Sequence, residues 1–282
     1  MKTYLDCIPC FMRQSLEGAR HLTDDVGVHE QIMRDVLRMT AALDLNQPPP
    51  LMGGAIHRRL RELTGVSDPY REAKQRFNRL ALAALPELAA MVERAPDPLL
   101  AAAELSIAAN AIDMGLGAPL TEAGVQAALC GATDAPFKAD GVAFSRAVAD
   151  ARAILYLADN AGEIAVDRLL IQALGPARVT LAVRGAPVLN DATLTDARQV
   201  GMPDLVQVID NGSDAPGTDL PNCSAAFLRR FNEADLIIAK GQGNYETLSG
   251  VEKNIFFLFK VKCPVISQHA GLPLGTHALL QR

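Results

Sequence analysis

Short apolar runs alternate with amphipathic stretches through the second half of the chain, from about residue 153 onward. The runs are rich in branched side chains, as buried strands are, whereas the stretches between them have the periodicity of helices. Strand and helix in strict succession predict a parallel sheet with both faces covered, because parallel strands need long crossover connections. We therefore predict a doubly wound, mostly parallel α/β domain, with strands over residues 154–157, 179–183, 205–209, 236–239 and 264–266.

The first half of the chain has a different pattern. From residue 6 to about residue 129 its apolar residues repeat at helical spacing, and strand-like alternation is scarce. Prolines at 48–50, 96 and 98 divide this half into three helical blocks, because proline ends helices. We predict an all-helical domain over residues 1–135 that helps to close the active site, followed by an α/β catalytic domain over residues 136–282.

Composition narrows the classes of partner. Hydrophobic residues make up 49% and charged residues 21% of the chain, as in a folded globular protein. A net charge of -5 without a basic run argues against nucleic-acid binding. No stretch of about 18 apolar residues occurs, so we expect no membrane span. Because the first residues carry no apolar segment, we expect a cytoplasmic protein whose five cysteines are reduced thiols or metal ligands.

The ends of the predicted strands are where function is expected, because ligands bind at the carboxyl ends of strands in open parallel sheets. Each of the first four runs is followed by polar residues and glycines. Any one of these segments has an ordinary explanation as a loop or a helix cap. Four that converge on one edge of the sheet indicate a binding site, built from residues 159–163, 184–191, 210–213 and 240–246.

Oxygen ligands stand out among these residues. Asp159, Asn160 and Asp191 are the hard donors that suit a divalent ion such as Mn, Mg, Co or Ni, with water completing the shell. Positive charge should reach the same edge through residues 184, 240 and 262, and glycines should let backbone amides approach a ligand. A phosphate held between the metal ion and Arg184 or Lys240 fits both signs of charge.

Other phosphate-binding motifs are missing. The chain has no Gly-x-x-x-x-Gly-Lys-Ser/Thr loop, and Gly241-Gln242-Gly243 lacks the third glycine of a dinucleotide fingerprint. A phosphatase with an aspartyl nucleophile typically has a second Asp two residues after the first, where this chain has Ala161. The remaining mechanism is attack of a metal-activated water on a phosphoryl group.

The helical half contributes weaker signals. Cys7 and Cys10 form a Cys-x-x-Cys that could be structural, redox-active or metal-binding. Residues 68–70, with Lys74 and Asn78 at helical spacing, form either a solvated helix face or part of a site.

A polar group interrupts the apolar segment over residues 99–112. Asn110, followed by Asp113, must be hydrogen-bonded or face a cleft there, because an unpaired polar group inside an apolar helix is costly. Both are therefore candidates for one wall of the site. Cys223 and Cys263 are interpreted as core thiols.

Several blocks of this sequence resemble the signature blocks of the damage-control phosphatases, long catalogued as domain of unknown function 89. The blocks are residues 159–163, 187–193, 240–246 and 262–264. The resemblance extends into the first half through residues 68–70 and 109–113, so that it covers nearly the whole chain. The leading Cys7-x-x-Cys10 is similar to the subgroup typical of archaea and bacteria.

The resemblance implies a helical domain joined to a Rossmann-like domain, and metal-dependent hydrolysis of sugar phosphates or damaged phosphometabolites. It implies Asp159, Asn160 and Asp191 as metal ligands. It also implies that the phosphate and substrate pocket is lined by Glu163, Lys240, Asn244 and Lys262. Two departures stand out: Ala109 replaces a glycine of its block, and residues 259–262 lack the Arg-Thr-x-Lys pattern of the eukaryotic members.

The sequence thus predicts a phosphatase of small phosphorylated molecules, with Asp159, Asp191 and Lys240 in catalytic roles. It does not predict the oligomeric state. Two alternatives remain. A methyltransferase that uses S-adenosylmethionine would need a glycine-rich first loop, for which residues 159–162 are a poor match. A non-catalytic metal or phosphometabolite sensor would use Cys7 and Cys10 as a switch.

Overall fold

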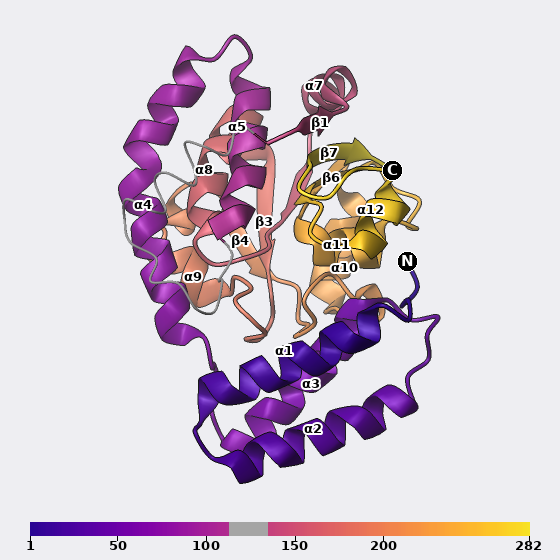
Figure 1. The fold of residues 1–282 in the computed structure, drawn as a ribbon. Coiled ribbons are helices and arrows are strands. Elements are labelled where there is room, and N and C mark those ends of the chain that lie inside the picture. The colour runs from indigo at the N-terminus through magenta and orange to yellow at the C-terminus, as the bar shows by residue number, and fades with distance from the viewer. Residues whose placement is uncertain (113–134) are drawn as a thin grey trace.

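A twisted seven-stranded sheet in the order β1-β7-β6-β5-β2-β3-β4 forms the centre of the molecule (Figure 1). The computed structural model describes residues 1–112 and 135–282. All neighbouring strands are parallel except β6 and β7. The strands are β1 (Phe137–Ala139), β2 (Ile154–Leu157), β3 (Val179–Val183), β4 (Gln207–Asp210), β5 (Leu236–Lys240), β6 (Ile255–Lys260) and β7 (His277–Gln281).

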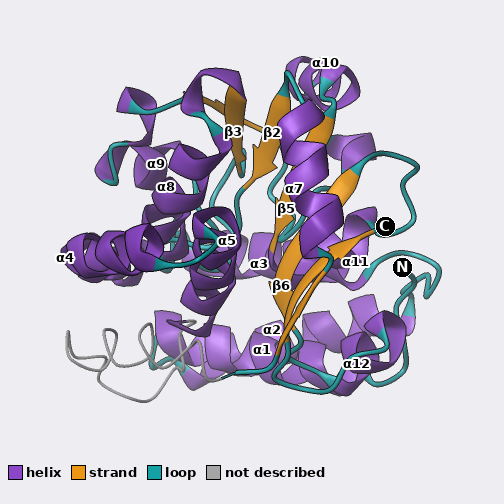
Figure 2. Cartoon of the chain, turned by 90° about the horizontal axis from the view of Figure 1, so that it is seen from above, coloured by secondary structure: helices purple, strands orange, loops and turns teal. Residues whose placement is uncertain are grey.

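Helices cover both faces of this sheet (Figure 2). Side chains alternate along β2, so that Ile154 and Tyr156 belong to one apolar core and Leu155 and Leu157 to the other. The first core is shared with α4 (Arg71–Arg94), α5 (Pro98–Ala108), α7 (Gly141–Asp150), α8 (Glu163–Leu174) and α9 (Leu194–Gln199). The second core is shared with α10 (Ala225–Glu233), α11 (Gly241–Leu248) and α12 (Pro264–Ala270). The predicted doubly wound, mostly parallel α/β fold is confirmed.

The remaining helices, α1 (Cys7–Leu22), α2 (Val26–Ala41) and α3 (Pro49–Thr64), form a separate layer below the sheet in Figure 1. They have an apolar core of their own, which includes Phe11, Ile32, Val36, Ile56 and Leu60. The next two helices of the predicted helical domain, α4 and α5, instead share the core of the sheet. None of the described helices is long and apolar enough to cross a membrane.

The strand predicted at residues 264–266 is wrong. This segment begins α12, with Pro264 in the first turn, where its missing N–H and fixed φ suit a helix. The strand next to β5 is β6, an apolar run that was not among the predicted strands. Two further strands that were not predicted, β1 and β7, extend the sheet beyond β6, with β7 antiparallel to β6.

The order of the strands has a switch point between β2 and β5. The chain passes from β2 to β3 and β4 on one side of the sheet and then crosses to β5 on the other side of β2. At such a switch point the two loops diverge and leave a crevice at the carboxyl ends of the strands, which is where open α/β sheets bind ligands. Asp159 follows β2 here, and Gly241 follows β5.

Candidate active site at the switch point

Backbone hydrogen bonds join the loop after β2 to a segment 30 residues later in the chain. Ala161 donates to the Asn190 carbonyl at 2.9 Å, and Ala192 donates to the Asp159 carbonyl at 2.8 Å. The two segments form an isolated antiparallel bridge between Asn160 and Asp191. The predicted metal ligands Asp159, Asn160 and Asp191 are therefore neighbours in space.

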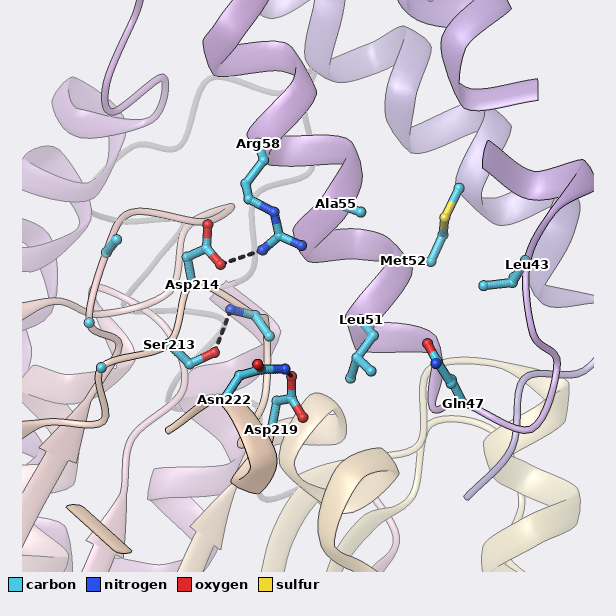
Figure 3. A pocket seen from close by; sticks show the side chains of 14 residues that line it. Leu43, Gln47, Leu51, Met52, Ala55, Arg58, Ser213, Asp214, Asp219 and Asn222 are labelled. Atoms are coloured by element: carbon cyan, nitrogen blue, oxygen red, sulfur yellow. Dashed lines mark hydrogen bonds and ion pairs between the residues drawn. The ribbon is translucent and has the colours of Figure 1, made fainter. Parts of the chain in front are cut away.

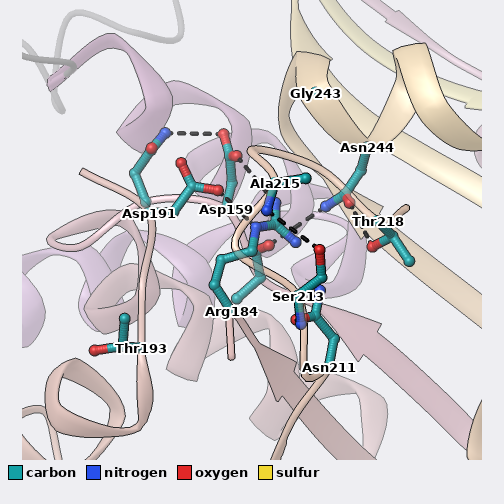
Figure 4. A network of polar contacts seen from close by, with 12 residues as sticks. Asp159, Arg184, Asp191, Thr193, Asn211, Ser213, Ala215, Thr218, Gly243 and Asn244 are labelled. Atoms are coloured by element: carbon teal, nitrogen blue, oxygen red, sulfur yellow. Dashed lines mark hydrogen bonds and ion pairs between the residues drawn. The ribbon is translucent and has the colours of Figure 1, made fainter. Parts of the chain in front are cut away.

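Arg184 approaches both aspartates with its guanidinium group (Figure 4). It follows β3 and is 2% exposed. Its Nε donates to Asp191 Oδ2 at 2.6 Å, and its Nη2 lies 3.8 Å from Asp159 Oδ1. An arginine in this position compensates the charge of both carboxylates and fixes the orientation of Asp191.

Two asparagine amides converge on the same carboxylates. Asn110 Nδ2 donates to Asp159 at 2.9 Å and to Glu163 at 2.7 Å. Asn160 Nδ2 donates to Asp159 at 2.8 Å and to Glu163 at 3.3 Å. Ionised carboxylates only accept hydrogen bonds, so each amide nitrogen must face them and each amide oxygen must face away. The buried Asn110 Oδ1 has no hydrogen-bond partner in the described structure.

Lys240 lies beneath the site and not on its rim. Its Nζ donates to Glu163 Oε1, to Asp167 Oδ1 at 2.8 Å and to the Ser106 carbonyl at 2.9 Å, and the residue is fully buried. These three bonds use all of its donors. Burial alone would lower the pKa of Lys240, but Asp167 and Glu163 outweigh it and raise the pKa. Of its three acceptors, Glu163 is the one that also accepts from Asn110 and Asn160 next to Asp159.

Negative charge accumulates around Asp159. Burial, followed by the charges of Glu163 and Asp191, raises the pKa of Asp159 well above its ordinary value, and Arg184 and Lys262 only partly oppose this. Burial also raises the pKa of Glu163, against the effect of Lys240. Carboxylates that repel one another in this way have a high affinity for an added cation.

Gly241 provides the space that the Asp159 carboxylate occupies. A Cβ at this position would lie 1.9 Å from Asp159 Oδ2, which no side chain allows. Its φ of +79° is also in the left-handed region that favours glycine. The first turn of α11 and the loop after β2 are therefore in direct contact.

Helix α4 supports the loop from the other side. Asn78 Oδ1 accepts from the Gly162 amide at 2.6 Å, and Asn78 Nδ2 donates to Asp196 at 3.2 Å. Lys74 pairs with Asp68 at 3.0 Å and with Asp196 at 3.2 Å. Lys74 and Asn78 are buried, so the polar face that the sequence left open between surface and site is an internal support. The spacing of four residues between Lys74 and Asn78 in the sequence already placed both side chains on one face of a helix.

The other predicted site residues lie in different settings. Asn244 is fully buried and fully bonded, because it donates to the Ala158 and Lys240 carbonyls and accepts from Thr218. Lys262 is exposed after β6, and its charge opposes the rise in the pKa of Asp159. Asp113 lies outside the described residues.

The residues around the crevice fit a divalent cation. Among the described residues, no three His, Cys, Asp or Glu side chains could hold a metal ion between them. An ion here would therefore need amide oxygens and water besides two carboxylates, which is the predicted set of Asp159, Asn160 and Asp191. A cation would also offset an excess of buried negative charge. The excess arises because two buried cations, Arg184 and Lys240, face four carboxylates, those of Asp159, Glu163, Asp167 and Asp191.

A cavity of about 530 Å³ lies beside the site, between α3 and the loops after β3 and β4 (Figure 3). The wall from α3 is mostly apolar, with Leu51, Met52 and Ala55, and also includes Arg58. The opposite wall is polar and includes Asp219, whose Oδ2 accepts from Asn222 at 2.7 Å. The cavity reaches Gly185, the residue after Arg184, and could accommodate a small organic molecule.

The four cysteines in the described part of the chain form no disulfide. Cys7, Cys10, Cys223 and Cys263 are free thiols of intermediate exposure. Cys10 Sγ accepts from Arg13 at 3.4 Å, and burial raises the pKa of Cys7. Cys223 and Cys263 pack against the second core of the sheet.

Known proteins resemble this chain along almost its whole length. A damage-control phosphatase ARMT1-like domain matches residues 3–277. An uncharacterized protein of Methanocaldococcus jannaschii is 33% identical, over 98% of this chain and 94% of its own length. A damage-control phosphatase of Archaeoglobus fulgidus is 32% identical, over 95% of both chains. The crystal structure of a DUF89 family protein from Pyrococcus horikoshii has a TM-score of 0.89 at 28% identity, over 100% of this chain and 99% of that chain.

Proposed function

The chain belongs to the damage-control phosphatase ARMT1-like family, and from that membership we propose that it is a divalent-metal-dependent phosphatase of small phosphorylated metabolites. Relatives that carry the name damage-control phosphatase support the phosphatase role. The observation that carries the metal dependence is that the bridge between Asn160 and Asp191 brings Asp159 and Asp191 to the same place at the switch point, where their charges and that of Glu163 are only partly compensated.

In this proposal Asp159, Asn160 and Asp191 hold the ion. When bound, the ion would lower the pKa of a water molecule and neutralise charge on the phosphoryl oxygens. Arg184 holds Asp191 in place through the bond at 2.6 Å. Glu163 accepts from the Asn160 amide nitrogen, which turns the amide oxygen outward for the ion.

Lys240 has a different role in this proposal from the one that the sequence indicated. Because its three donors are bound to Glu163, Asp167 and Ser106, it keeps Glu163 in position and does not itself bind the phosphate. Lys262, which is exposed near Asp159, supplies positive charge toward the substrate. The organic part of the substrate would occupy the cavity beside α3, with its hydroxyl groups toward Asp219 and Asn222.

Asp159→Ala and Asp191→Ala test this function. Release of phosphate from para-nitrophenyl phosphate is measured with Mn, Mg, Co and Ni and after chelation. We expect wild-type turnover to require one of these ions and each variant to lose at least about 100-fold, because each lacks a proposed ligand.

The control is Asp150→Ala, which removes an exposed carboxylate at the end of α7. It should retain wild-type turnover. Full activity after chelation, or unchanged turnover in folded Asp159→Ala or Asp191→Ala protein, would refute the proposal.

A further inference from the structure

Two N–H donors next to the proposed metal ligands are buried and have no acceptor within residues 1–112 and 135–282. They are Arg184 Nη2 and Asn211 Nδ2, and their residues are 2% and 1% exposed. Buried donors almost always have a partner, because an unmade hydrogen bond to a buried group is costly. Two unpaired donors therefore indicate an acceptor that binds between them.

The two side chains are neighbours on adjacent strands. Strands β3 and β4 pair with Val183 opposite Asp210, so Arg184 and Asn211 follow at the same level. The Asn211 amide donates to the Val183 carbonyl at 2.9 Å, and Asn211 Oδ1 accepts from the Gly185 amide at 3.0 Å. Both side chains thus lie at the carboxyl edge of the sheet.

The orientation of the Asn211 amide is fixed by the backbone. Its Oδ1 accepts from two backbone amides, those of Gly185 and of Ser213 at 2.9 Å. A carboxamide oxygen must occupy this position, since the amide nitrogen could only donate. Asn211 Nδ2 is therefore held on the opposite side, as a donor that is set before any ligand binds.

The chemistry of the pair points to an oxyanion. Arg184 already binds Asp191 through Nε, and its Nη2 lies 3.8 Å from Asp159 Oδ1, so Nη2 is at the edge of the proposed metal ligands. A guanidinium donor and an amide donor at the ends of adjacent strands suit the oxygens of a phosphoryl group, which offer several acceptors in a fixed geometry.

We infer that Asn211, together with Arg184 Nη2, binds a phosphoryl oxygen of the substrate. This inference rests on the proposed function and adds a substrate-binding residue that neither the sequence motifs nor the family resemblance marked. Asn211 orients the phosphate against the metal ligands. It is not a metal ligand in this proposal, because its oxygen is fully used by two backbone amides.

Asn211→Asp is the most informative variant. It keeps an oxygen for the two backbone amides and places a second oxygen where Nδ2 was, so the fold retains its hydrogen bonds. Because the variant removes a buried donor that has no acceptor among the described residues, the thermal unfolding midpoint should stay equal or rise. A bound phosphate would lose the Nδ2 donor and meet a negative charge in its place.

We expect the KM for para-nitrophenyl phosphate and the inhibition constant of inorganic phosphate to rise together, on the order of 10- to 100-fold. The affinity for Mn measured without phosphate should change far less. The matched control is Asn232→Asp, which adds the same charge on the exposed face of α10 and should leave both constants unchanged.

Two outcomes would overturn the inference. One is an unchanged phosphate inhibition constant in Asn211→Asp protein that still turns over. The other is a lowered unfolding midpoint with unchanged phosphate binding, which is the result expected if Asn211 Nδ2 only binds a buried water. If the wild-type protein hydrolyses no ester, the proposed function fails, and calorimetry with inorganic phosphate still tests Asn211 separately.

Discussion

Two lysines of this protein are buried with two carboxylates each, yet only one of them reaches the candidate site. Lys240 pairs with Glu163 and Asp167 beneath the crevice. Lys74 pairs with Asp68 and Asp196 between α4 and α9. Both lysines are almost fully buried. Each cluster thus has one buried lysine and two carboxylates, although Asp68 is only partly buried.

The two clusters differ in the other hydrogen bonds that their carboxylates accept. Glu163 also accepts from Asn110 and Asn160, whose amides bind Asp159. By contrast, Asp196 accepts from the Thr193 amide and hydroxyl and so closes the capping box of α9. The difference shows that a buried ion pair does not reveal its role by itself. Its role depends on whether a partner touches a side chain that faces the ligand.

Two glycines show the same difference between a residue that contacts a proposed metal ligand and one that contacts a supporting helix. Gly241 and Gly162 both have a φ of +79°. A Cβ on Gly241 would meet the Asp159 carboxylate, whereas a Cβ on Gly162 would lie 2.9 Å from Phe77 Cβ of α4. One glycine therefore makes room for a proposed metal ligand and the other for a supporting helix.

Among the variants that compare the two clusters and the two glycines, Lys240→Met should have the largest effect. Removing one partner of a buried ion pair leaves uncompensated charge, so unfolding should become easier by about 3–5 kcal/mol. Turnover should fall on the order of 100-fold, because Glu163 loses the group that holds it. Denaturant unfolding and assays of para-nitrophenyl phosphate hydrolysis at a temperature where the variant is folded measure the two effects.

Glu163→Gln combined with Lys240→Met sharpens this test. The double variant removes one buried negative charge along with the positive one, so it should recover part of the lost stability but none of the turnover. Recovery of turnover would show that the Lys240 cluster acts only on stability.

Gly241→Ala should have the next largest effect. Its Cβ would lie 1.9 Å from Asp159 Oδ2, so the carboxylate must move. A shift of about 1 Å at a reacting group can lower turnover on the order of 100-fold, and the left-handed φ adds about 1–2 kcal/mol of destabilisation.

Gly162→Ala is the matched control for Gly241→Ala. It has the same φ and should lose similar stability, but it displaces Phe77 and not Asp159, so its turnover should fall less. Equal losses of turnover in the two variants would contradict the contrast between the two glycines.

Lys74→Met should have the smallest effect on turnover. Its loss of stability should match that of Lys240→Met, about 3–5 kcal/mol, because Asp68 and Asp196 lose their buried partner. Turnover of the folded protein should fall less than about tenfold, since none of the three side chains touches a proposed ligand. A loss as large as that of Lys240→Met, in protein shown to be folded by circular dichroism, would remove the distinction between the clusters.

The sequence predicted much of the fold because its apolar runs are local signals. Four of the five predicted strands exist, and the doubly wound architecture follows from their alternation with helices. The fifth was wrong because Pro264-Val265-Ile266 is too short for periodicity to separate a strand from the first turn of a helix. The pairing of β6 with an antiparallel β7 depends on contacts that no local pattern encodes.

The candidate site was partly predictable. Asp159, Asn160 and Asp191 come together as expected, because strand ends in a parallel sheet converge on one edge. Lys240 was expected on the rim, but burial and its three acceptors place it below. The sequence placed Lys240 at the end of a strand, as observed, but that position does not specify which way its side chain points. Asn211 was among the strand-end residues, but nothing in its neighbours marked it.

The sequence by itself determined the kind of protein: a doubly wound sheet, polar strand ends and a set of oxygen donors, since these follow from residue type and local spacing. Only the tertiary structure decided what each polar group does. Lys74 and Lys240 have the same chemistry. Asn244 Nδ2 donates to two carbonyls, whereas Asn211 Nδ2 has no acceptor in the described part of the chain. Those outcomes depend on which distant segments supply the second and third contacts of a buried side chain, and a hydrogen bond between residues far apart in the chain leaves no periodic trace in the sequence.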